Sequence, residues 1–518
     1  MTCVPVSRIL VPLCAALLAA CAAGPHYHTP QLPLPARYDA ARDPSGAPAG
    51  EVDVTRWWRA LKDPELDSLI ARAITGNPDL RIALDHLQAA RAFEAASIGA
   101  VLPEAGAAAG GGKGTGSDLT RGRAPQALVS ADNGSDFAHI NGIAGFDALW
   151  QLDVFGKYRR EIEATRADTE ALAAARNAVL IAIVADVASG YVDLRGLQVR
   201  AQVLKAASDA LRDSLRIVSI RYQRGITNEL DVTLATRELG VLEAQEAPLA
   251  AQIRAAQYSL ATLLGVYPEE LVEELSSTAM VPSVPQAVDP GLPLDLLRRR
   301  PDIQEAERQL AAATARIGVA TADLFPSLAV NGAVGVQRQG LGNIPLSEHI
   351  WSVGAAVAWP LLDFGALDAQ VEAADLQARA LLVNYKKTIQ GAVREVDTDL
   401  GQFGAEQASL GKLDGALIAS QRAVTLASER YQRGLTDFLN VIDAQRQEYD
   451  IEEQYAAAQV AAAEDFIALY RSLGGGWQDY QQLPPIHRPQ PAVIAAFERV
   501  LHTPDPQREE SAAEHAAR

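Results

Sequence analysis

Residues 221–227 read Arg-Tyr-Gln-Arg-Gly-Ile-Thr, and residues 430–436 read Arg-Tyr-Gln-Arg-Gly-Leu-Thr. The two copies are 209 residues apart (430 − 221), and the same offset relates Trp150 to Trp359. Further upstream, Asn77-Pro78-Asp79 and Arg300-Pro301-Asp302 are 223 apart (300 − 77). Repeats of this length are far longer than those of solenoid proteins. The sequence therefore predicts two equivalent structural units placed around an axis.

Each copy of the motif follows a long stretch without proline, at residues 156–222 and 365–431. Apolar residues in the second stretch recur at alternating spacings of four and three, which is typical of packed helices. About 66 residues at 1.5 Å each predict a helix of about 100 Å. A second helix is expected to return over roughly 229–264 and 437–473.

The motif itself is predicted to form the turn between these helices. Gly225 and Gly434 stand where a helix needs a left-handed C-terminal residue. Thr227 and Thr436 follow as candidates for capping the returning helix. The turn is expected to lie at the end of the molecule opposite the strands.

Between the shorter upstream helices and the long helices, the period changes to two. In residues 351–359, Trp351, Val353, Ala355, Val357 and Trp359 share one face, as in a strand. Its length and terminal aromatics suit a membrane-spanning strand, although an ordinary half-buried strand alternates in the same way. Each half is expected to supply two strands, joined by loops at about 112–138 and 337–349, and Trp150 is a further candidate interface aromatic.

The N-terminus is a targeting segment with one arginine and a short apolar stretch over residues 1–20. Leu18-Ala19-Ala20-Cys21 resembles a bacterial lipobox, in which Cys21 becomes the lipidated first residue. The alternative is an ordinary signal peptide that happens to precede a cysteine. Beyond Cys21 the chain has no cysteine, so no disulfide is expected.

The composition of the chain indicates its remaining segments and excludes some classes of function. Residues 21–55 are predicted to form an extended, lipid-anchored leash, residues 56–275 and 276–483 the two repeats, and residues 484–518 a polar tail. The net charge of −18 argues against nucleic acid as a partner. No nucleotide, nucleophile or metal-ligand motif is present, so an enzyme is not expected.

Four strands cannot close a barrel, because even the smallest filled barrels use about eight. An open strand edge is not tolerated in lipid. If the strands span a membrane, several copies must pool them, and three copies would give twelve strands around a lumen. The fold class expected is mainly α with a β membrane portion.

The chain resembles the TolC-like outer membrane efflux proteins, specifically their lipoprotein branch of the OprM or NodT type. The resemblance covers about residues 21–475 and rests on an ordered set of motifs: Leu18-Ala19-Ala20-Cys21, Trp57-Trp58, Asn77-Pro78-Asp79, Trp150 to Gly156, Arg300-Pro301-Asp302, Trp359 to Gly365 and Arg430 to Arg446. It implies a homotrimer whose duplicated helical hairpins form an α-barrel, continued by a 12-stranded β-barrel in outer membrane lipid. It also implies a periplasmic adaptor and an inner-membrane pump, of RND type, as partners.

The resemblance also implies roles for residues around the two turns. An apolar constriction falls on Leu439, an acidic ring on Asp443, and the contacts that hold a closed tip on Tyr431 and Arg446. Asp231 and Arg237 repeat part of this chemistry in the first half. The residues expected to contact the adaptor are Arg221, Tyr222, Gly225, Thr227, Arg430, Gly434 and Thr436.

The function expected is that of a passive conduit that carries small molecules, such as drugs or toxic organic compounds, to the exterior. Protein secretion and metal-cation efflux use the same scaffold and stay open as alternatives. A structural coiled-coil lipoprotein would explain the helices but not the paired strands. No cofactor is expected beyond a covalent lipid at Cys21.

Overall fold

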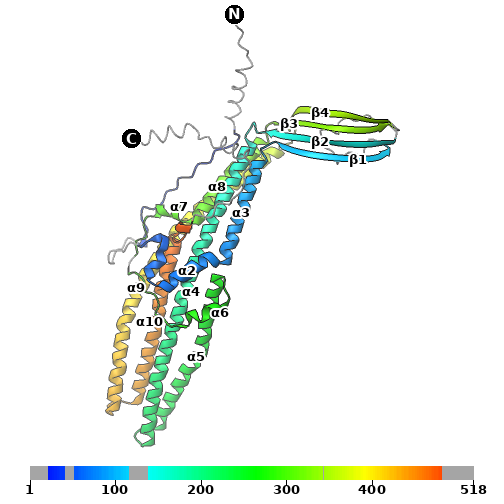
Figure 1. The fold of residues 1–518 in the computed structure, drawn as a ribbon. Helices are drawn as coiled ribbons and strands as arrows, with labels where there is room; N and C mark the ends of the chain where they lie inside the picture. Colours follow the sequence, from blue (N-terminus) through cyan, green and yellow to red (C-terminus); the bar gives the residue numbers. More distant parts are fainter. Residues whose placement is uncertain (1–21, 41–51, 116–137, 287, 342–343, 481–518) are drawn as a thin grey trace.

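The structure is a computed structural model and describes residues 22–40, 52–115, 138–286, 288–341 and 344–480. A long helical bundle carries a four-stranded sheet at one end and two helical hairpin turns at the other (Figure 1). Its main elements in chain order are η2 (Val54–Leu61), α2 (Pro64–Gly76), α3 (Pro78–Gly99), β1 (Glu104–Thr115), β2 (Ala138–Leu152), α4 (Lys157–Gln223), α5 (Glu229–Leu264), α6 (Pro268–Val272), α7 (Leu296–Arg299), α8 (Pro301–Ala322), β3 (Ser327–Leu341), β4 (Ile344–Ala358), α9 (Ala366–Gln432) and α10 (Phe438–Ser472). Short 3₁₀ turns lie at Glu274–Ser276, Pro293–Asp295 and Gln478–Tyr480.

The internal repeat of the sequence is also a repeat of structure. Helices α4 and α9 are each 67 residues long and begin 209 residues apart (366 − 157). Helices α3 and α8 are each 22 residues long and begin 223 apart (301 − 78). The predicted long helices and their returning partners α5 and α10 are confirmed.

The sheet joins the two halves of the chain. Its order is β1-β2-β3-β4, all neighbours are antiparallel, and the β2–β3 pair crosses from the first repeat to the second. Strands β1 and β4 are the two edges of this sheet. Each edge presents unpaired backbone groups that a further strand could satisfy.

The predicted strand length in the second repeat was wrong. The β3–β4 ladder continues to the pair Leu341–Ile344, so the expected loop at 337–349 is mostly strand. Trp351 consequently lies in the middle of β4, although it was predicted at one end. Pro345 hid the extension, because proline normally interrupts strands but is tolerated on a sheet edge. In the first repeat β1 continues to Thr115, and the loop beyond it lies outside the described residues.

One face of β4 is apolar and open, as the alternation predicts. The side chains of Trp351, Val353 and Val357 are each more than two-thirds exposed. Trp150 near the end of β2 and Trp359 just after β4 lie at the end of the sheet that adjoins the helical bundle. Their indole N–H groups donate to the carbonyls of Val101 and Leu324, both at 3.0 Å.

The main hydrophobic core lies partway along the bundle, where η2 and α2 cover α4 and α10. The Trp57-Trp58 motif is buried there, and Trp57 stacks on Tyr470 with ring centroids 5.9 Å apart. By length and composition α4 contains a window apolar enough to cross a membrane, but more than half of that window is buried within the protein. Helix α4 thus serves as a core helix of the bundle.

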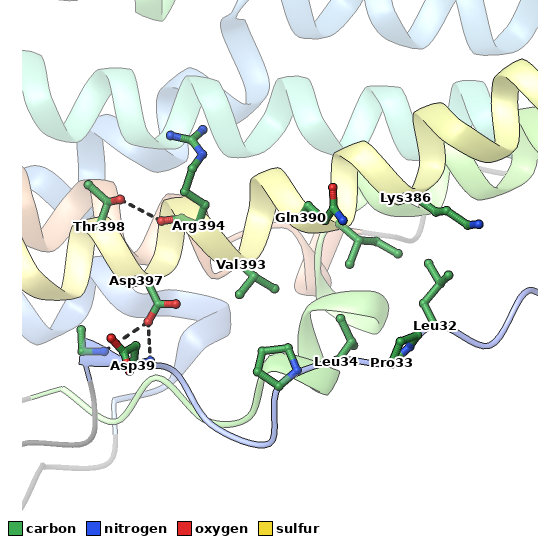
Figure 2. Close-up of a pocket in the computed structure, with 13 residues that line it drawn as sticks. Leu32, Pro33, Leu34, Asp39, Lys386, Gln390, Val393, Arg394, Asp397 and Thr398 are labelled. Atoms are coloured by element: carbon green, nitrogen blue, oxygen red, sulfur yellow. Dashed lines mark hydrogen bonds between the residues drawn. The ribbon is translucent and has the colours of Figure 1, made fainter.

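Residues 22–40, which we call the N-terminal strap, form no α-helix or strand but pack along the helical bundle. The N–H of Ala23 donates to the carbonyl of Phe155, and Tyr27 donates to Glu307 at 2.5 Å. Figure 2 shows the end of the strap lying along α9, where Asp397 accepts hydrogen bonds from the backbone of Asp39 and Ala40. A cavity of about 820 Å³ remains between them. The described part of the predicted leash is therefore bound rather than free.

Candidate functional site

The two helical turns have the same backbone geometry. At the first, Gly225 adopts φ +70°, its N–H donates to the carbonyl of Tyr222, and the next N–H donates to that of Arg221. At the second, Gly434 adopts φ +72° and the same two hydrogen bonds form, to Tyr431 and Arg430. The left-handed conformation favours glycine, so the predicted C-terminal caps are confirmed.

The predicted N-terminal caps were wrong by one residue. Asn228 and Asp437 occupy the N-cap positions of the returning helices. The Asn228 side chain accepts a hydrogen bond from the N–H of Asp231 at 3.2 Å, whereas the Asp437 side chain makes no capping hydrogen bond. Thr227 instead donates its hydroxyl hydrogen to Asp231. Thr436 accepts a hydrogen bond from the Asn440 side chain at 2.8 Å. Both threonines therefore fix the first turn of the helix from outside it.

A small core holds the two turns together. Tyr431 is buried and packs on Phe438, with ring centroids 5.3 Å apart. The guanidinium of Arg221 lies 4.6 Å from the centre of the Tyr431 ring. This cation–π contact joins the end of α4 to the end of α9, and so joins the two repeats.

The polar atoms of this contact are incompletely satisfied. The hydroxyl oxygen of Tyr431 and Nε of Arg221 are buried, and neither has a hydrogen-bond partner among the described residues. Burial raises the pKa of the Tyr431 hydroxyl, the charge of Arg221 and the nearby Thr227 side chain oppose that rise, and the charge of Asp231 adds to it. Leaving a buried hydroxyl without a hydrogen-bond partner costs free energy.

The reciprocal contact of the repeat does not form within the chain. Arg430 and Tyr222 occupy the positions that correspond to Arg221 and Tyr431, and Tyr222 is exposed. The sequence predicts Arg221 as a hairpin-tip residue that contacts the adaptor, and it does not predict the position of Arg221 over Tyr431. The repeated Arg-Tyr pair was the available signal, but it does not reveal which arginine crosses to which tyrosine.

The predicted gate residues lie around this core with different exposures. Leu439 and its repeat mate Leu230 are both about 60% exposed (59% and 61%). Asp443 lies one helical turn beyond Leu439, and both Asp443 and Arg446 are exposed. Within the described part of the chain, neither forms an ion pair.

Arg237, the repeat mate of Arg446, contacts its sequence neighbour. Its guanidinium lies 3.4 Å from the carboxylate of Glu238, a residue that lines the cavity between α4, α5 and α10. The structure thus brings Arg221, Tyr431, Thr227 and Asp231 together. It leaves Leu439, Asp443, Arg446 and Arg237 on open surfaces of a single copy.

A cavity of about 230 Å³ lies below the turns, between α4, α5 and α10. Glu448 and Glu452 contribute to its wall. Burial raises the pKa of both carboxyl groups, and the charge of Glu452 raises that of Glu448 further. These acids favour the protonated form more than free glutamate does.

Two further predictions fall elsewhere. Cys21 lies outside the described residues. Among the residues that the structure describes, no group of three or more histidine, cysteine, aspartate or glutamate side chains is arranged to hold a metal ion.

Comparison with known proteins agrees with this architecture. The family model described as outer membrane efflux protein matches residues 69–266 and 292–475. Nodulation protein T of Rhizobium leguminosarum bv. viciae is 29% identical over 500 residues, covering 96% of this chain and 99% of that protein. The toluene efflux pump outer membrane protein TtgI of Pseudomonas putida is 30% identical, covering 89% and 96%.

Solved structures give the same result. The outer-membrane channel OprN superposes with a TM-score of 0.79 at 34% identity, covering 88% of this chain and 100% of that one. The open state of the Neisseria gonorrhoeae MtrE outer membrane channel superposes with a TM-score of 0.72 at 26% identity, covering 89% and 100%.

Proposed function

The chain belongs to the outer membrane efflux protein family, and we propose that three copies of it form the channel through which a tripartite pump exports apolar organic molecules. Members of this family are passive outer membrane channels and not enzymes. They work in tripartite pumps, which implies a periplasmic adaptor and an inner-membrane pump as partners. The fold is that of TolC-like channels, with most of its length in helices.

The main observation that supports a trimer is that the four-stranded sheet has two unpaired edges. Four strands cannot enclose a lumen, and unpaired edges in lipid cost several kcal/mol per group. Two copies would give eight strands, which enclose an interior just wide enough for side chains. Three copies would give twelve strands and a lumen, with β4 of one copy pairing with β1 of the next.

The class of molecule proposed for export is inferred from the names of related proteins. TtgI is named for toluene, and a further relative, SrpC of Pseudomonas putida, for solvent. The channel contains no energy source of its own, so the choice of substrate lies largely with the pump. We therefore propose small apolar organic molecules as the exported class.

The gate is proposed at the helical turns. Leu439 would narrow the lumen, and Asp443 from three copies would form an acidic ring one turn further along. Three carboxylates around one axis repel each other and attract cations. Arg446 and Arg237 would offset this repulsion, while Asp231 and Tyr431 would join neighbouring copies in the closed state. The exposure of Leu439 and Asp443 in the single copy supports this proposal.

Lipidation is proposed at Cys21. The strap supports it, because Ala22 packs against Gly156 at the junction between β2 and α4. A lipid on the preceding residue would enter the membrane beside the strands. Cys21→Ser should abolish labelling of the protein by radioactive palmitate, and labelling that persists in this variant would remove the proposal.

The export function is tested in a strain that lacks this gene. Restoring the chain should restore toluene tolerance and lower the accumulation of an apolar dye, provided that the adaptor and pump are present. A matched strain without the adaptor should stay sensitive. Full tolerance in the absence of the chain would contradict the proposed export role.

A further inference from the structure

The cavity of about 820 Å³ between the N-terminal strap and α9 is a groove with apolar walls (Figure 2). Leu32 and Leu34 of the strap are half-buried beside it. Ile389 and Val393 of α9 face it and belong to the same hydrophobic cluster. Protein interiors are otherwise closely packed, so this groove, which we call the strap groove, has room for further apolar side chains.

The strap groove has an acidic end and a basic end. Asp39 and Asp397 line one end, and Lys386 lines the other. Residues 386–397 of α9 separate the two ends, a length of about 18 Å. Lys386 is exposed and forms no ion pair with any residue that the structure describes. The groove therefore favours an occupant with an apolar face and a charge of opposite sign at each end.

The sequence beyond the last described residue contains a segment that fits this description. Residues 491–501 read Pro-Ala-Val-Ile-Ala-Ala-Phe-Glu-Arg-Val-Leu. Proline at the first position, the alanines and the His-Thr-Pro that follows predict a helix about 16 Å long. Spacings of three and four place five apolar residues on one face of that helix: Val493, Ile494, Phe497, Val500 and Leu501.

Charged residues accompany this apolar face at both ends of the segment. Glu498 borders the face, because it lies four residues after Ile494 and three before Leu501. Arg499 falls on the opposite side of the helix. Arg488 precedes the helix. The segment thus carries a positive charge before its apolar face and a negative charge beside the later part of that face.

The described part of the chain ends near the strap groove. Trp477 donates its indole N–H to the carbonyl of Arg299 at 2.9 Å. The next residue, Arg300, donates to Glu395 of α9 at 2.7 Å, within the stretch that lines the groove. Residues 481–490 are proline-rich and span about 30 Å when extended. That reach exceeds the separation of packed helices, which is about 8–10 Å.

We propose that residues 491–501 form a helix that lies in the strap groove of their own chain and runs antiparallel to α9. Arg488 then lies toward Asp397, and Glu498 lies beside Lys386. The helix closes the groove, holds the strap on α9 and so joins the two ends of the mature chain. The match to the family model ends at residue 475, so this contact lies outside what the chain shares with that model.

Hydrogen exchange of the full-length protein tests the docking. In a chain shortened after Tyr480, exchange in the strap and in residues 386–398 should be several-fold faster than in the full chain. The full-length I494D/F497D variant should behave like the shortened chain, because it places charge on the apolar face. The matched A492D/A495D variant carries the same charges on the other face and should stay protected. Equal exchange in the full and shortened chains would overturn the proposal, including the case in which a second copy covers the groove.

Cross-linking identifies the chain to which the docked segment belongs. No cysteine follows Cys21 in the sequence, so introduced thiols report single positions. The P33C/A496C variant, treated with a short bismaleimide, should give linked peptides at the mass of one chain. The P33C/S511C variant, whose second thiol lies beyond the segment, should give several-fold less. A product mainly at twice the chain mass would overturn docking within the chain, and so would equal yields for the two variants.

Charge reversal tests the pairing of Glu498 with Lys386. Glu498→Lys should speed exchange in the strap at low salt, because it opposes Lys386. The double variant K386E/E498K should restore the protection, and high salt should weaken both effects. Arg499→Glu, on the opposite side of the helix, is the matched control and should leave exchange unchanged. The same exchange in the single and double variants would contradict the assigned pair.

Discussion

At the residue scale, Tyr431 is the point where the two repeats meet at the helical turns. Its ring is buried between Phe438 and the guanidinium of Arg221, but its hydroxyl has no partner among the described residues. The ring and the hydroxyl therefore have separable roles. The ring stabilises the chain, and the hydroxyl is available to a neighbouring copy.

Tyr431→Phe should change the free energy of unfolding by less than about 1 kcal/mol, because no intramolecular hydrogen bond is lost. Tyr431→Ala should cost about 3–5 kcal/mol, because it empties a packed aromatic site. Thermal or denaturant unfolding followed by circular dichroism measures both. If Tyr431→Phe proved as destabilising as Tyr431→Ala, the hydroxyl would have a structural role within the chain. Tyr222→Phe, at the exposed repeat mate, is the matched control.

Asp443 and Arg446 are exposed in a single copy. In the proposed trimer, these residues face the lumen and the same residues of the other two copies. Replacing both by Ala should raise single-channel conductance in planar bilayers several-fold, since it removes the ring of charge and its counter-charges. A conductance equal to that of the unaltered channel would remove these residues from the gate. Arg216→Ala serves as the comparison, because Arg216 is exposed and pairs with Asp213 on its own helix.

Glu448 and Glu452 predict a pH dependence. Burial raises the pKa of both in the folded chain above the ordinary value of about 4.3 for glutamate. For an acid with a raised folded pKa, the stabilising contribution is present below the ordinary pKa and is lost as pH rises through the folded one. Helix α10, where it packs beside α4 and α5 at the cavity that both acids line, should thus be better protected at pH 5 than at pH 7.

Hydrogen exchange along α10, corrected for the intrinsic pH dependence of exchange, measures this difference. The E448Q/E452Q variant should be well protected at both pH values, because glutamine carries no charge to desolvate. Greater protection at pH 7 than at pH 5 in the unaltered chain would reverse the predicted sign.

At the element scale, the long helices end where glycine permits φ above zero. Gly225→Ala should cost about 1–2 kcal/mol through backbone strain alone, since nothing lies within 4 Å of the added carbon. Gly240→Ala, on an open face of α5, should instead stabilise by about 0.5–1 kcal/mol. Hydrogen-exchange protection in the last turns of α4 measures the effect of Gly225→Ala, and global unfolding measures the effect of Gly240→Ala. If both substitutions changed stability in the same direction, backbone strain at Gly225 would not be what ends α4.

The sequence was a good guide to elements that follow from local chemistry. The period of the apolar residues and the glycine caps predicted α4, α5, α9 and α10 to within one or two residues. It failed where tertiary pairing overrides local signals, as at Pro345, which lies inside a strand that its neighbour β3 extends. The bound strap was also missed, because its contacts with Phe155, Glu307 and Asp397 come from distant parts of the chain.

In the candidate site, too, the sequence predicts which residues matter but not the contacts between distant parts of the chain. The sequence marked Arg221 and Tyr431 separately, through the repeated motif. Their contact joins the first repeat to the second, and an internal repeat does not reveal which copies of its residues cross between units. Distances between repeats are set by the packing of α4 on α8 and α10, which only the folded chain defines.

At the scale of the whole molecule, a single chain leaves surfaces of both its sheet and its helical bundle without a partner. Its sheet has two open edges, and the contacts of α8 with both long helices have no complete counterpart at α3. The net charge of −18 per chain adds repulsion between copies, and this repulsion is stronger at low salt.

The measurement that tests this account most directly is the subunit number of the mature protein extracted from the outer membrane. Native mass spectrometry in a mild detergent should give a single species of three chains, because three copies pool twelve strands into a barrel with a lumen. A stable monomer or dimer that still conducts ions in a planar bilayer would contradict it.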